Sequence, residues 1–267
     1  MPSKTNHLNK KLALLIDGDN AQPSLITKIL AEAAKFGNIT IRRVYGDWTT
    51  PQMKGWKDAL NNHAVQPIQQ FRYTVGKNAT DSAMIIDAMD ILHSEVVDTF
   101  CLVSSDSDYT RLATRIREEG LFVMGIGKST TPKPFVNACN IFTYTENLEL
   151  ADEDLQGTEI TVENAQNKEE TAKNTDQKQP SGTKKGTKPN PVPLLKEAFS
   201  MAGDSDWVHL GLFGNYLSQL DPGFDPRTYG FKQLSQLLKA YRNFFELRFS
   251  ESEGPSDVYV RLKTKSK

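Results

Sequence analysis

The sequence predicts an α/β domain with a mainly parallel sheet, followed by a small winged-helix-like α+β domain. The chain has 267 residues, more than one domain usually holds. Short apolar runs alternate with stretches of helical periodicity up to about residue 148, which is the order of strands and helices in a parallel sheet. After a polar segment, three helical patterns precede two alternating runs.

Six strands are expected in the first region. Residues 12–16 are apolar throughout, which fits a strand buried on both faces. Residues 65–71 include Pro67, which has no amide hydrogen to donate, so this strand is expected near an edge of the sheet. The expected strands are 12–16, 39–45, 65–71, 100–103, 121–126 and 141–144, and the expected helices are 23–33, 56–62, 80–95, 107–119 and 134–139.

Residues 149–190 are predicted to be a disordered linker between domains at 10–148 and 191–263. This segment is polar, and no large apolar residue lies between Val162 and Val192. Such a segment cannot bury enough surface to offset its ordering entropy. The second domain is expected to contain helices around 194–199, 210–217 and 229–241, and a hairpin formed by 244–249 and 258–262.

Composition restricts the classes of function. A net charge of −1 gives no global signature of a nucleic-acid binder, so any such affinity must come from local patches. Cys101 and Cys139 are too few for a disulfide framework, which predicts a reduced, cytoplasmic setting. No stretch approaches the ~20 apolar residues of a membrane span, so no membrane association is expected.

Aspartates follow two of the predicted strands. The strand at 12–16 runs into Asp-Gly-Asp-Asn, and the strand at 100–103 runs into Ser-Ser-Asp-Ser-Asp. Because the carboxyl ends of parallel strands meet at one edge of a sheet, the two clusters face each other if these strands are neighbours. A further aspartate starts the long helix at 80–95. The four acids singled out are Asp17, Asp81, Asp106 and Asp108.

Clustered carboxylates suggest a divalent cation, because the charges repel unless a cation lies between them. Mg²⁺ and Mn²⁺ prefer oxygen ligands, and the bound ion activates a water for attack on a phosphate ester. The alternative for Asp81 or Asp108 taken singly is a cap at a helix N-terminus. Supporting roles are expected for Asp19, Asn20 and Ser105.

Basic and aromatic residues are candidates for contacts with a nucleic-acid strand. Lys77 lies four residues before Asp81 and is a candidate partner for a substrate phosphate. The other candidates in the first domain are Arg42, Arg43, Arg72, Lys128 and Lys133 for the backbone, and Tyr45, Trp48, Trp56 and Tyr73 for base stacking. For the aromatic residues, a place in the core is the alternative.

These motifs resemble the NYN domains, which are PIN-like nucleases. The matching segments are Leu-Ile-Asp-Gly-Asp-Asn at 15–20, Lys-Asn-Ala-Thr-Asp at 77–81 and Ser-Ser-Asp-Ser-Asp-Tyr at 104–109. The resemblance implies a Rossmann-like fold and a Mg²⁺- or Mn²⁺-dependent ribonuclease acting on single-stranded or loop RNA. It also implies that the four acids named above bind metal, with Asn20 beside them.

Residues 191–262 resemble an OST-HTH (LOTUS) domain, notably in Leu-Phe-Gly-Asn-Tyr-Leu at 212–217 and Tyr-Gly-Phe-Lys-Gln-Leu at 229–234. Such domains are associated with RNA binding or protein contacts. Candidate phosphate contacts are Arg227, Lys232, Lys239 and Arg242, with ordinary solvated charges as the alternative for each.

Two other functions stay open at this stage. A haloacid-dehalogenase-like phosphatase would use Asp17 as nucleophile and Asp19 as general acid, although the chain leaves no room for the flap that such enzymes insert. A non-catalytic RNA-binding adaptor would bind RNA without turnover. Whether the chain forms a homodimer is also left open.

Overall fold

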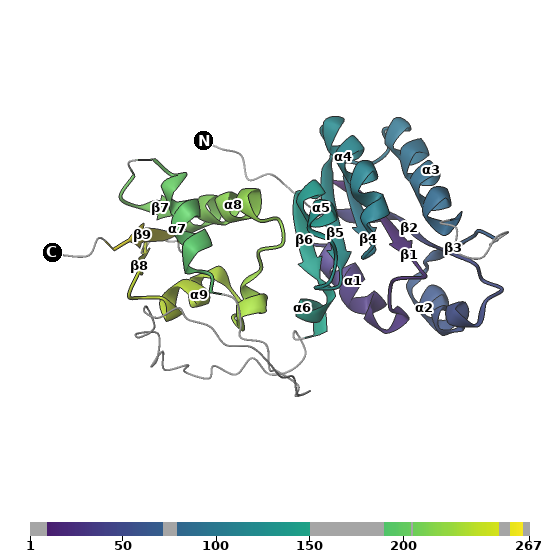
Figure 1. The fold of residues 1–267 in the computed structure, drawn as a ribbon, viewed down its shortest axis with the longest axis horizontal. Helices are drawn as coiled ribbons and strands as arrows, with labels where there is room; N and C mark the ends of the chain where they lie inside the picture. Colours follow the sequence, from purple (N-terminus) through teal and green to yellow (C-terminus); the bar gives the residue numbers. More distant parts are fainter. Residues whose placement is uncertain (1–9, 72–78, 150–189, 204, 251–256, 264–267) are drawn as a thin grey trace, which may run out of the picture.

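The first domain is built on a six-stranded parallel sheet in the order β3-β2-β1-β4-β5-β6 (Figure 1). The computed structural model describes residues 10–71, 79–149, 190–203, 205–250 and 257–263. The strands are β1 (Lys11–Asp17), β2 (Asn38–Gly46), β3 (Gln66–Gln69), β4 (Thr99–Val103), β5 (Phe122–Gly127) and β6 (Ile141–Tyr144). The predicted parallel α/β fold is confirmed, and β3 lies at an edge, as Pro67 indicated.

Helices cover both faces of this sheet, which explains why its central strands are apolar without alternation. On one face Leu12, Leu14 and Ile16 pack with α1 and α2, and on the other Ala13 and Leu15 pack with α3, α4 and α5. The helices are α1 (Ile26–Ala33), α2 (Trp56–His63), α3 (Ala79–His93), α4 (Thr110–Glu118), α5 (Lys133–Ala138) and α6 (Thr145–Glu149).

Some local expectations were wrong. The helix α6 was not predicted, because five residues are too few to show a helical repeat. The helices expected at 23–33 and 107–119 each begin with a 3-10 turn, Pro23–Leu25 and Ser107–Tyr109. Cys101 and Cys139 are buried as free thiols in the two separate cores, in agreement with the absence of a disulfide framework.

The C-terminal domain packs three helices against a three-stranded sheet in the order β7-β9-β8. Its elements are α7 (Val192–Ser200), β7 (Val208–His209), α8 (Leu210–Leu220), α9 (Leu234–Ala240), β8 (Phe245–Phe249) and β9 (Val258–Leu262). The predicted hairpin is confirmed as β8 and β9. The helix expected at 229–241 is shorter, because a 3-10 turn at Pro226–Tyr229 ends on Gly230 at φ +90°.

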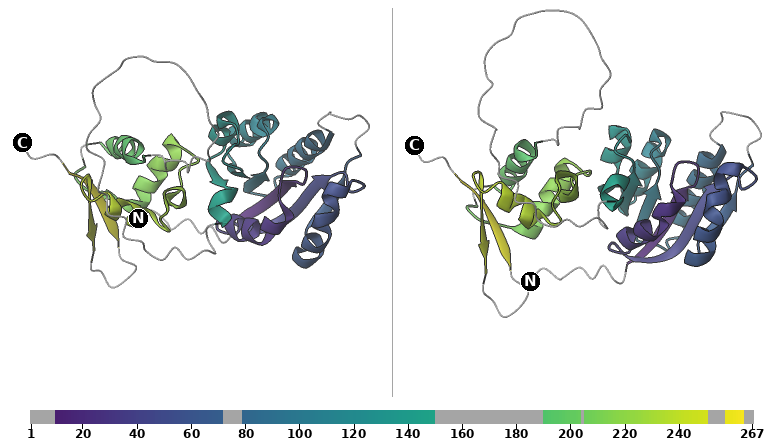
Figure 2. Two further views of the ribbon diagram at one scale, coloured as in Figure 1. Left: turned by 60° about the horizontal axis from the view of Figure 1, so that its bottom comes forward. Right: turned by 90° about the horizontal axis from the view of Figure 1, so that it is seen from below.

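The two domains touch along the β6 edge of the large sheet (Figures 1 and 2). The amide of Phe142 donates to the carbonyl of Pro222 at 2.7 Å, and Asn147 Nδ2 donates to Thr228 Oγ1 at 2.9 Å. A Cβ atom at Gly223 would lie 2.6 Å from the hydroxyl of Tyr144, so this contact requires glycine. The predicted linker at 149–190 lies almost wholly outside the described residues, and its disorder stays a prediction.

A buried charge triad lies at this contact. Arg227 donates to Glu32 on α1 at 2.9 and 3.1 Å and to Asp225 at 2.9 Å. Burial alone would raise the pKa of Glu32, but hydrogen bonds from Arg227 and Lys35 outweigh it and lower that pKa. Both acids are buried, and Asp225 depends on Arg227 for compensation of its charge, whereas Glu32 pairs with both Arg227 and Lys35.

Among the described residues, none of the helices has both the length and the apolar character needed to cross a membrane.

We predict that Arg227→Gln separates the domains. Loss of the guanidinium leaves Asp225 without its cation and Glu32 with Lys35 alone, at a cost of about 3 kcal/mol if the contact stayed closed, so opening to hydrate the acids is favoured. Small-angle X-ray scattering should show a larger radius of gyration than for the parent protein. Arg242→Gln, at an exposed arginine of the same domain, is the control. Superimposable scattering from Arg227→Gln and the parent would contradict the prediction.

Candidate metal centre

The four predicted acids lie at the carboxyl edge of the sheet, on neighbouring elements. Asp17 is the last residue of β1, and Asp106 and Asp108 follow β4. The strands β1 and β4 pair with each other, which was the condition for the two acidic clusters to face each other. Asp81 lies in the first turn of α3. One carboxylate oxygen from each of Asp81, Asp106 and Asp108 lies within 4.8 Å of the others.

This spacing fits a small divalent cation. Mg²⁺ binds oxygen at about 2.0–2.1 Å, so two ligands on opposite sides of the ion are about 4.2 Å apart. The three oxygens therefore need only small side-chain movements to share one ion. Asp81 and Asp106 are half-buried and Asp108 is exposed, which leaves one side open for water and a phosphate.

Asp17 is placed differently from the other three. It is completely buried, and it accepts hydrogen bonds from Asn20 Nδ2 at 2.6 Å, Ser104 Oγ at 2.9 Å and the amide of Asp19 at 3.1 Å. Burial raises the pKa of Asp17 and these hydrogen bonds oppose that rise. The group of three carboxylates does not include Asp17, so its predicted role as a metal ligand is untested.

The pKa of Asp81 is affected by the charges of the other three acids. Burial raises its pKa, a hydrogen bond from the Tyr109 hydroxyl at 2.8 Å lowers it, and the charges of Asp17, Asp106 and Asp108 raise it further. The net shift is upward. A cation at this point would remove the cause of the repulsion.

Ser104 ties the two strand ends together. Its hydroxyl donates to Asp17 and accepts the amide of Asp106 at 3.1 Å. Asp106 in turn caps the 3-10 turn that follows, accepting the amide of Asp108 at 3.0 Å. Close packing fixes this loop from the other side, because a Cβ atom at Gly127 would lie 2.4 Å from the Ser104 carbonyl oxygen.

The predicted supporting residues contact the site indirectly. Asn20 holds Asp17, Asp19 accepts the Thr80 hydroxyl at 3.0 Å, and Ser105 accepts the amide of Lys128 at 2.9 Å. Sequence reasoning gave no role to Thr80 or to Tyr109. What could have indicated a role for them was their position, since each lies directly next to one of the predicted aspartates in the motifs.

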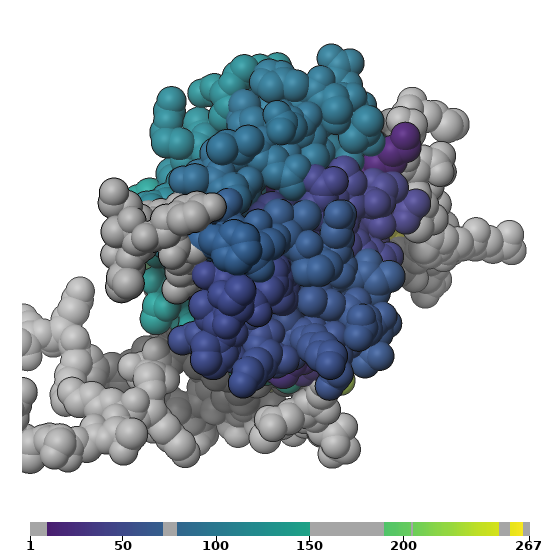
Figure 3. All heavy atoms as spheres, turned by 90° about the vertical axis from the view of Figure 1, so that its right-hand side faces the viewer, coloured from purple at the N-terminus to yellow at the C-terminus, as the bar shows by residue number. Residues whose placement is uncertain are grey.

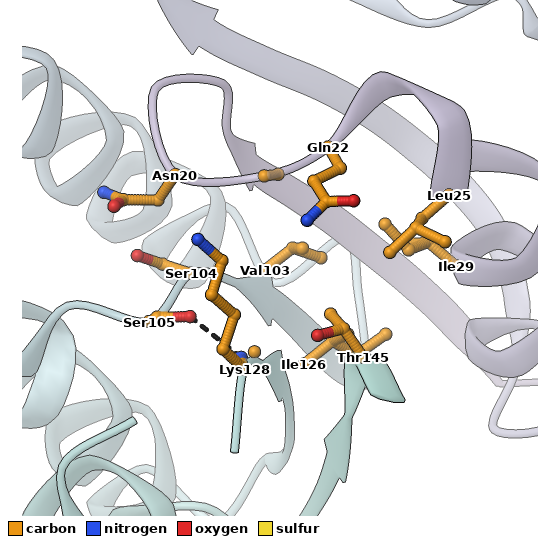
Figure 4. Close-up of a pocket in the computed structure, with 12 residues that line it drawn as sticks. Asn20, Gln22, Leu25, Ile29, Val103, Ser104, Ser105, Ile126, Lys128 and Thr145 are labelled. Carbon is orange, nitrogen blue, oxygen red and sulfur yellow. Dashed lines mark hydrogen bonds between the residues drawn. The ribbon is translucent and has the colours of Figure 1, made fainter. Parts of the chain in front are cut away.

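A small pocket adjoins the acids between the ends of β1, β4 and β5. Asn20, Gln22 and Lys128 lie at its mouth, and the Lys128 side chain extends toward the segment that carries the other two (Figure 4). Its volume is about 10 Å³, enough for about one water molecule. The pocket in this form is too small for a nucleotide.

The predicted basic contacts are dispersed. Arg42 donates to the His63 carbonyl and Arg43 to Asp87, both along β2, whereas Lys128 is exposed beside the acids. Arg227 is occupied by its two acids, so in this arrangement it is not available to phosphate, and Lys232 is exposed near it. Lys77, Arg72 and Tyr73 lie outside the described residues.

The aromatic candidates differ in how much of each side chain is exposed. Tyr45 and Trp56 are core residues, with 0% and 1% of their surface exposed, and their proposed stacking role is wrong in this structure. Trp48 is half-buried at the end of β2 and keeps part of its ring accessible.

Comparisons with known proteins agree with both predicted resemblances. The NYN domain model matches residues 11–175, and the OST-HTH/LOTUS domain model matches residues 185–256. A curated, uncharacterized protein of Methanocaldococcus jannaschii is 28% identical over 127 residues, which cover 44% of this chain and 47% of that protein. The chain thus spans about half the length of this relative.

Two solved structures of proteins without an assigned function are also similar. One, from Vibrio parahaemolyticus, is 19% identical with a TM-score of 0.44, covering 52% of this chain and 94% of that one. The other, from Nitrosomonas europaea, is 34% identical with a TM-score of 0.26, covering 35% of this chain and 96% of that one.

We predict that Asp81→Asn stabilises the metal-free protein at neutral pH. Because the folded state raises the pKa of Asp81 above 3.8, the folded state binds the proton more tightly, and the free energy of unfolding falls as pH rises through that window. In EDTA at pH 7 the variant should melt at a higher temperature than the parent. The difference should shrink as the pH approaches 3.8.

Mn²⁺ should reverse the order of the two melting temperatures, because an ion that binds only the folded state stabilises the protein against unfolding. The parent should gain more than the variant. Asp90→Asn, at an exposed position on the same helix, is the control and should follow the parent in both conditions. A variant that melts below the parent in EDTA would contradict the electrostatic account of the cluster.

Proposed function

The chain belongs to the NYN domain family and carries an OST-HTH/LOTUS domain, and from this premise we propose that it is a divalent-metal-dependent ribonuclease. The observation that supports this proposal most directly is the group of three carboxylate oxygens within 4.8 Å on the open edge of the sheet. Mg²⁺ or Mn²⁺ is the cofactor that this all-oxygen donor set suits.

Each residue of the site has a distinct part in the proposal. Asp81, Asp106 and Asp108 would hold the ion, which would supply Lewis-acid polarisation of a phosphate ester and activation of water for its hydrolysis. Tyr109 fixes the Asp81 carboxylate through its hydroxyl. Asp17, held by Ser104 and Asn20, adds negative charge behind the three ligands and so strengthens their attraction for a cation.

RNA is the substrate that the domain combination supports. OST-HTH/LOTUS domains bind RNA or proteins, and here this domain contacts the domain that carries the acids. A phosphatase of the haloacid-dehalogenase type would need Asp17 as an accessible nucleophile. Asp17 is completely buried and its oxygens accept three hydrogen bonds, which disfavours that chemistry.

We predict metal-dependent cleavage of single-stranded RNA by the full chain. Labelled single-stranded and hairpin RNAs would be incubated with Mg²⁺, Mn²⁺ or EDTA and resolved on denaturing gels. Asp106→Asn should slow cleavage by at least about 100-fold, since even partners outside the metal's own ligands contribute 10–100-fold. Asp90→Asn should cleave like the parent.

Two results would reject the nuclease. Intact RNA in every condition, with RNA still bound, would identify a non-catalytic RNA-binding adaptor. Equal cleavage by the parent and an Asp81→Asn/Asp106→Asn double variant would assign the activity to a contaminant.

We also predict that the C-terminal domain binds RNA phosphates. Lys232 and Arg242 are exposed near and after α9. Replacing both with alanine should weaken binding of single-stranded RNA and reduce the slope of log affinity against log salt by about 0.7 for each phosphate that is no longer neutralised. Fluorescence anisotropy in EDTA over a salt series measures both quantities. An unchanged slope would assign this surface to protein contacts.

A further inference from the structure

A groove opens at the β3 edge of the sheet, on the side of the molecule seen in Figure 3. It lies between α2 and β3 and has a volume of about 680 Å³, far larger than the pocket beside the acids. The lining residues are Trp48, Met53, Lys54, Lys57, Leu60, Pro67 and Gln69. This is the size range of small-molecule and nucleotide sites.

The Trp48 side chain is held in a fixed orientation in this groove. Its indole Nε1 donates to the Ile68 carbonyl at 3.0 Å, and its amide donates to Gln69 Oε1 at 3.0 Å. Asp47 fixes the same turn, because its Oδ1 accepts Gln69 Nε2 at 3.0 Å and the Thr49 hydroxyl at 2.6 Å. A ring fixed before binding loses little entropy when a ligand stacks on it.

The groove combines an apolar surface with positive charge. Met53, Leu60 and Pro67 form the apolar part, and none of the described residues that line it is acidic. Lys54 and Lys57 are both exposed, and neither forms an ion pair with another described residue. Such a surface is complementary to a flat, uncharged aromatic ring linked to a negatively charged phosphate, which describes a nucleotide.

The groove lies close to the metal centre. The strands are parallel, so β3, β2, β1 and β4 end at the same edge, and β3 is three strands from β4, which leads into Asp106 and Asp108, or about 14 Å. Met53 also packs against the acidic loop, since its Cε lies 2.7 Å from the position of a Cβ at Gly18. At about 3.4 Å per stacked nucleotide, this separation corresponds to roughly four nucleotides.

We propose that the groove binds a nucleotide of single-stranded RNA close to the phosphate that is cut, with its base stacked on Trp48 and adjacent phosphates contacted by Lys54 and Lys57. This inference deepens the ribonuclease proposal and rests on it for the position of the cut. Bases in a duplex are stacked on each other and cannot stack on a side chain, so the groove selects unpaired RNA.

A second copy of this chain is a less suitable occupant. An edge strand pairs with another strand through free amide and carbonyl groups. In β3, Pro67 has no amide hydrogen and the Ile68 carbonyl already accepts the Trp48 indole. The edge is therefore poorly suited to strand addition.

The test measures binding of a short single-stranded RNA to the full chain in EDTA, where cleavage does not interfere. Trp48→Ala should weaken binding about tenfold, the loss expected for one base–aromatic stack, and Trp48→Phe should restore most of it. Lys54→Ala/Lys57→Ala should also weaken binding and reduce the salt slope by about 1.4, or 0.7 for each lysine. Arg111→Ala, an exposed charge on α4, is the control.

Fluorescence provides a direct signal of stacking. The chain has three tryptophans, of which Trp56 is 1% exposed. In a Trp207→Phe background, quenching by the RNA should therefore report Trp48 and should be absent in Trp48→Phe/Trp207→Phe. Duplex RNA of the same sequence should quench little.

The outcomes separate this inference from the ribonuclease proposal. Cleavage lost in Asp106→Asn, with RNA affinity within twofold of the parent in both the Trp48→Ala and double-lysine variants, would overturn the groove and leave the nuclease. Intact RNA in every metal, with affinity dependent on Trp48, would support the binding site without the nuclease. Equal affinity for duplex and single-stranded RNA, or no RNA binding by the parent, would overturn the groove.

Discussion

Electrostatic repulsion among carboxylates at the ends of β1 and β4 is the constraint on which the site depends. Parallel pairing of these two strands brings Asp17 and Asp106 to the same edge, and α3 adds Asp81. The Ser104 hydroxyl donates to Asp17 and accepts the amide of Asp106, so the two loops cannot move apart without breaking the Ser104–Asp17 hydrogen bond. The fold thus holds like charges together, which is a stable arrangement when a cation compensates them.

The strand order places the acids, the groove and the C-terminal domain at different positions along the sheet. The acids lie in the centre, on β1 and β4, the apolar groove with its two lysines lies beyond β2, and the C-terminal domain covers the opposite edge at β6. In our proposal an RNA strand runs across the acids, and one of its bases stacks on Trp48. The Arg227 contact with Glu32 matters in this scheme because it fixes where the second domain presents its exposed cations.

The sequence predicted the features that arise from local patterns. Apolar runs located central strands such as β1 and β4, because a strand buried on both faces has no polar position to obscure it, whereas β3 at the edge is polar and mostly exposed. The roles of individual residues depend on tertiary contacts, so the sequence predicted them less well. Nothing in the sequence distinguishes Asp17, enclosed by Asn20 and Ser104, from Asp106, which stays half-buried, and nothing distinguishes the buried Trp56 from the accessible Trp48.

Calorimetric titration of the metal-free protein with Mn²⁺ is the most direct test of the metal centre, because it reports the cation site without reference to any substrate. We expect saturable binding by the parent and loss of that binding in an Asp81→Asn/Asp106→Asn double variant whose circular dichroism spectrum is unchanged. Equal Mn²⁺ binding by the folded double variant, or no binding by the parent, would contradict the claim that these acids form a metal centre.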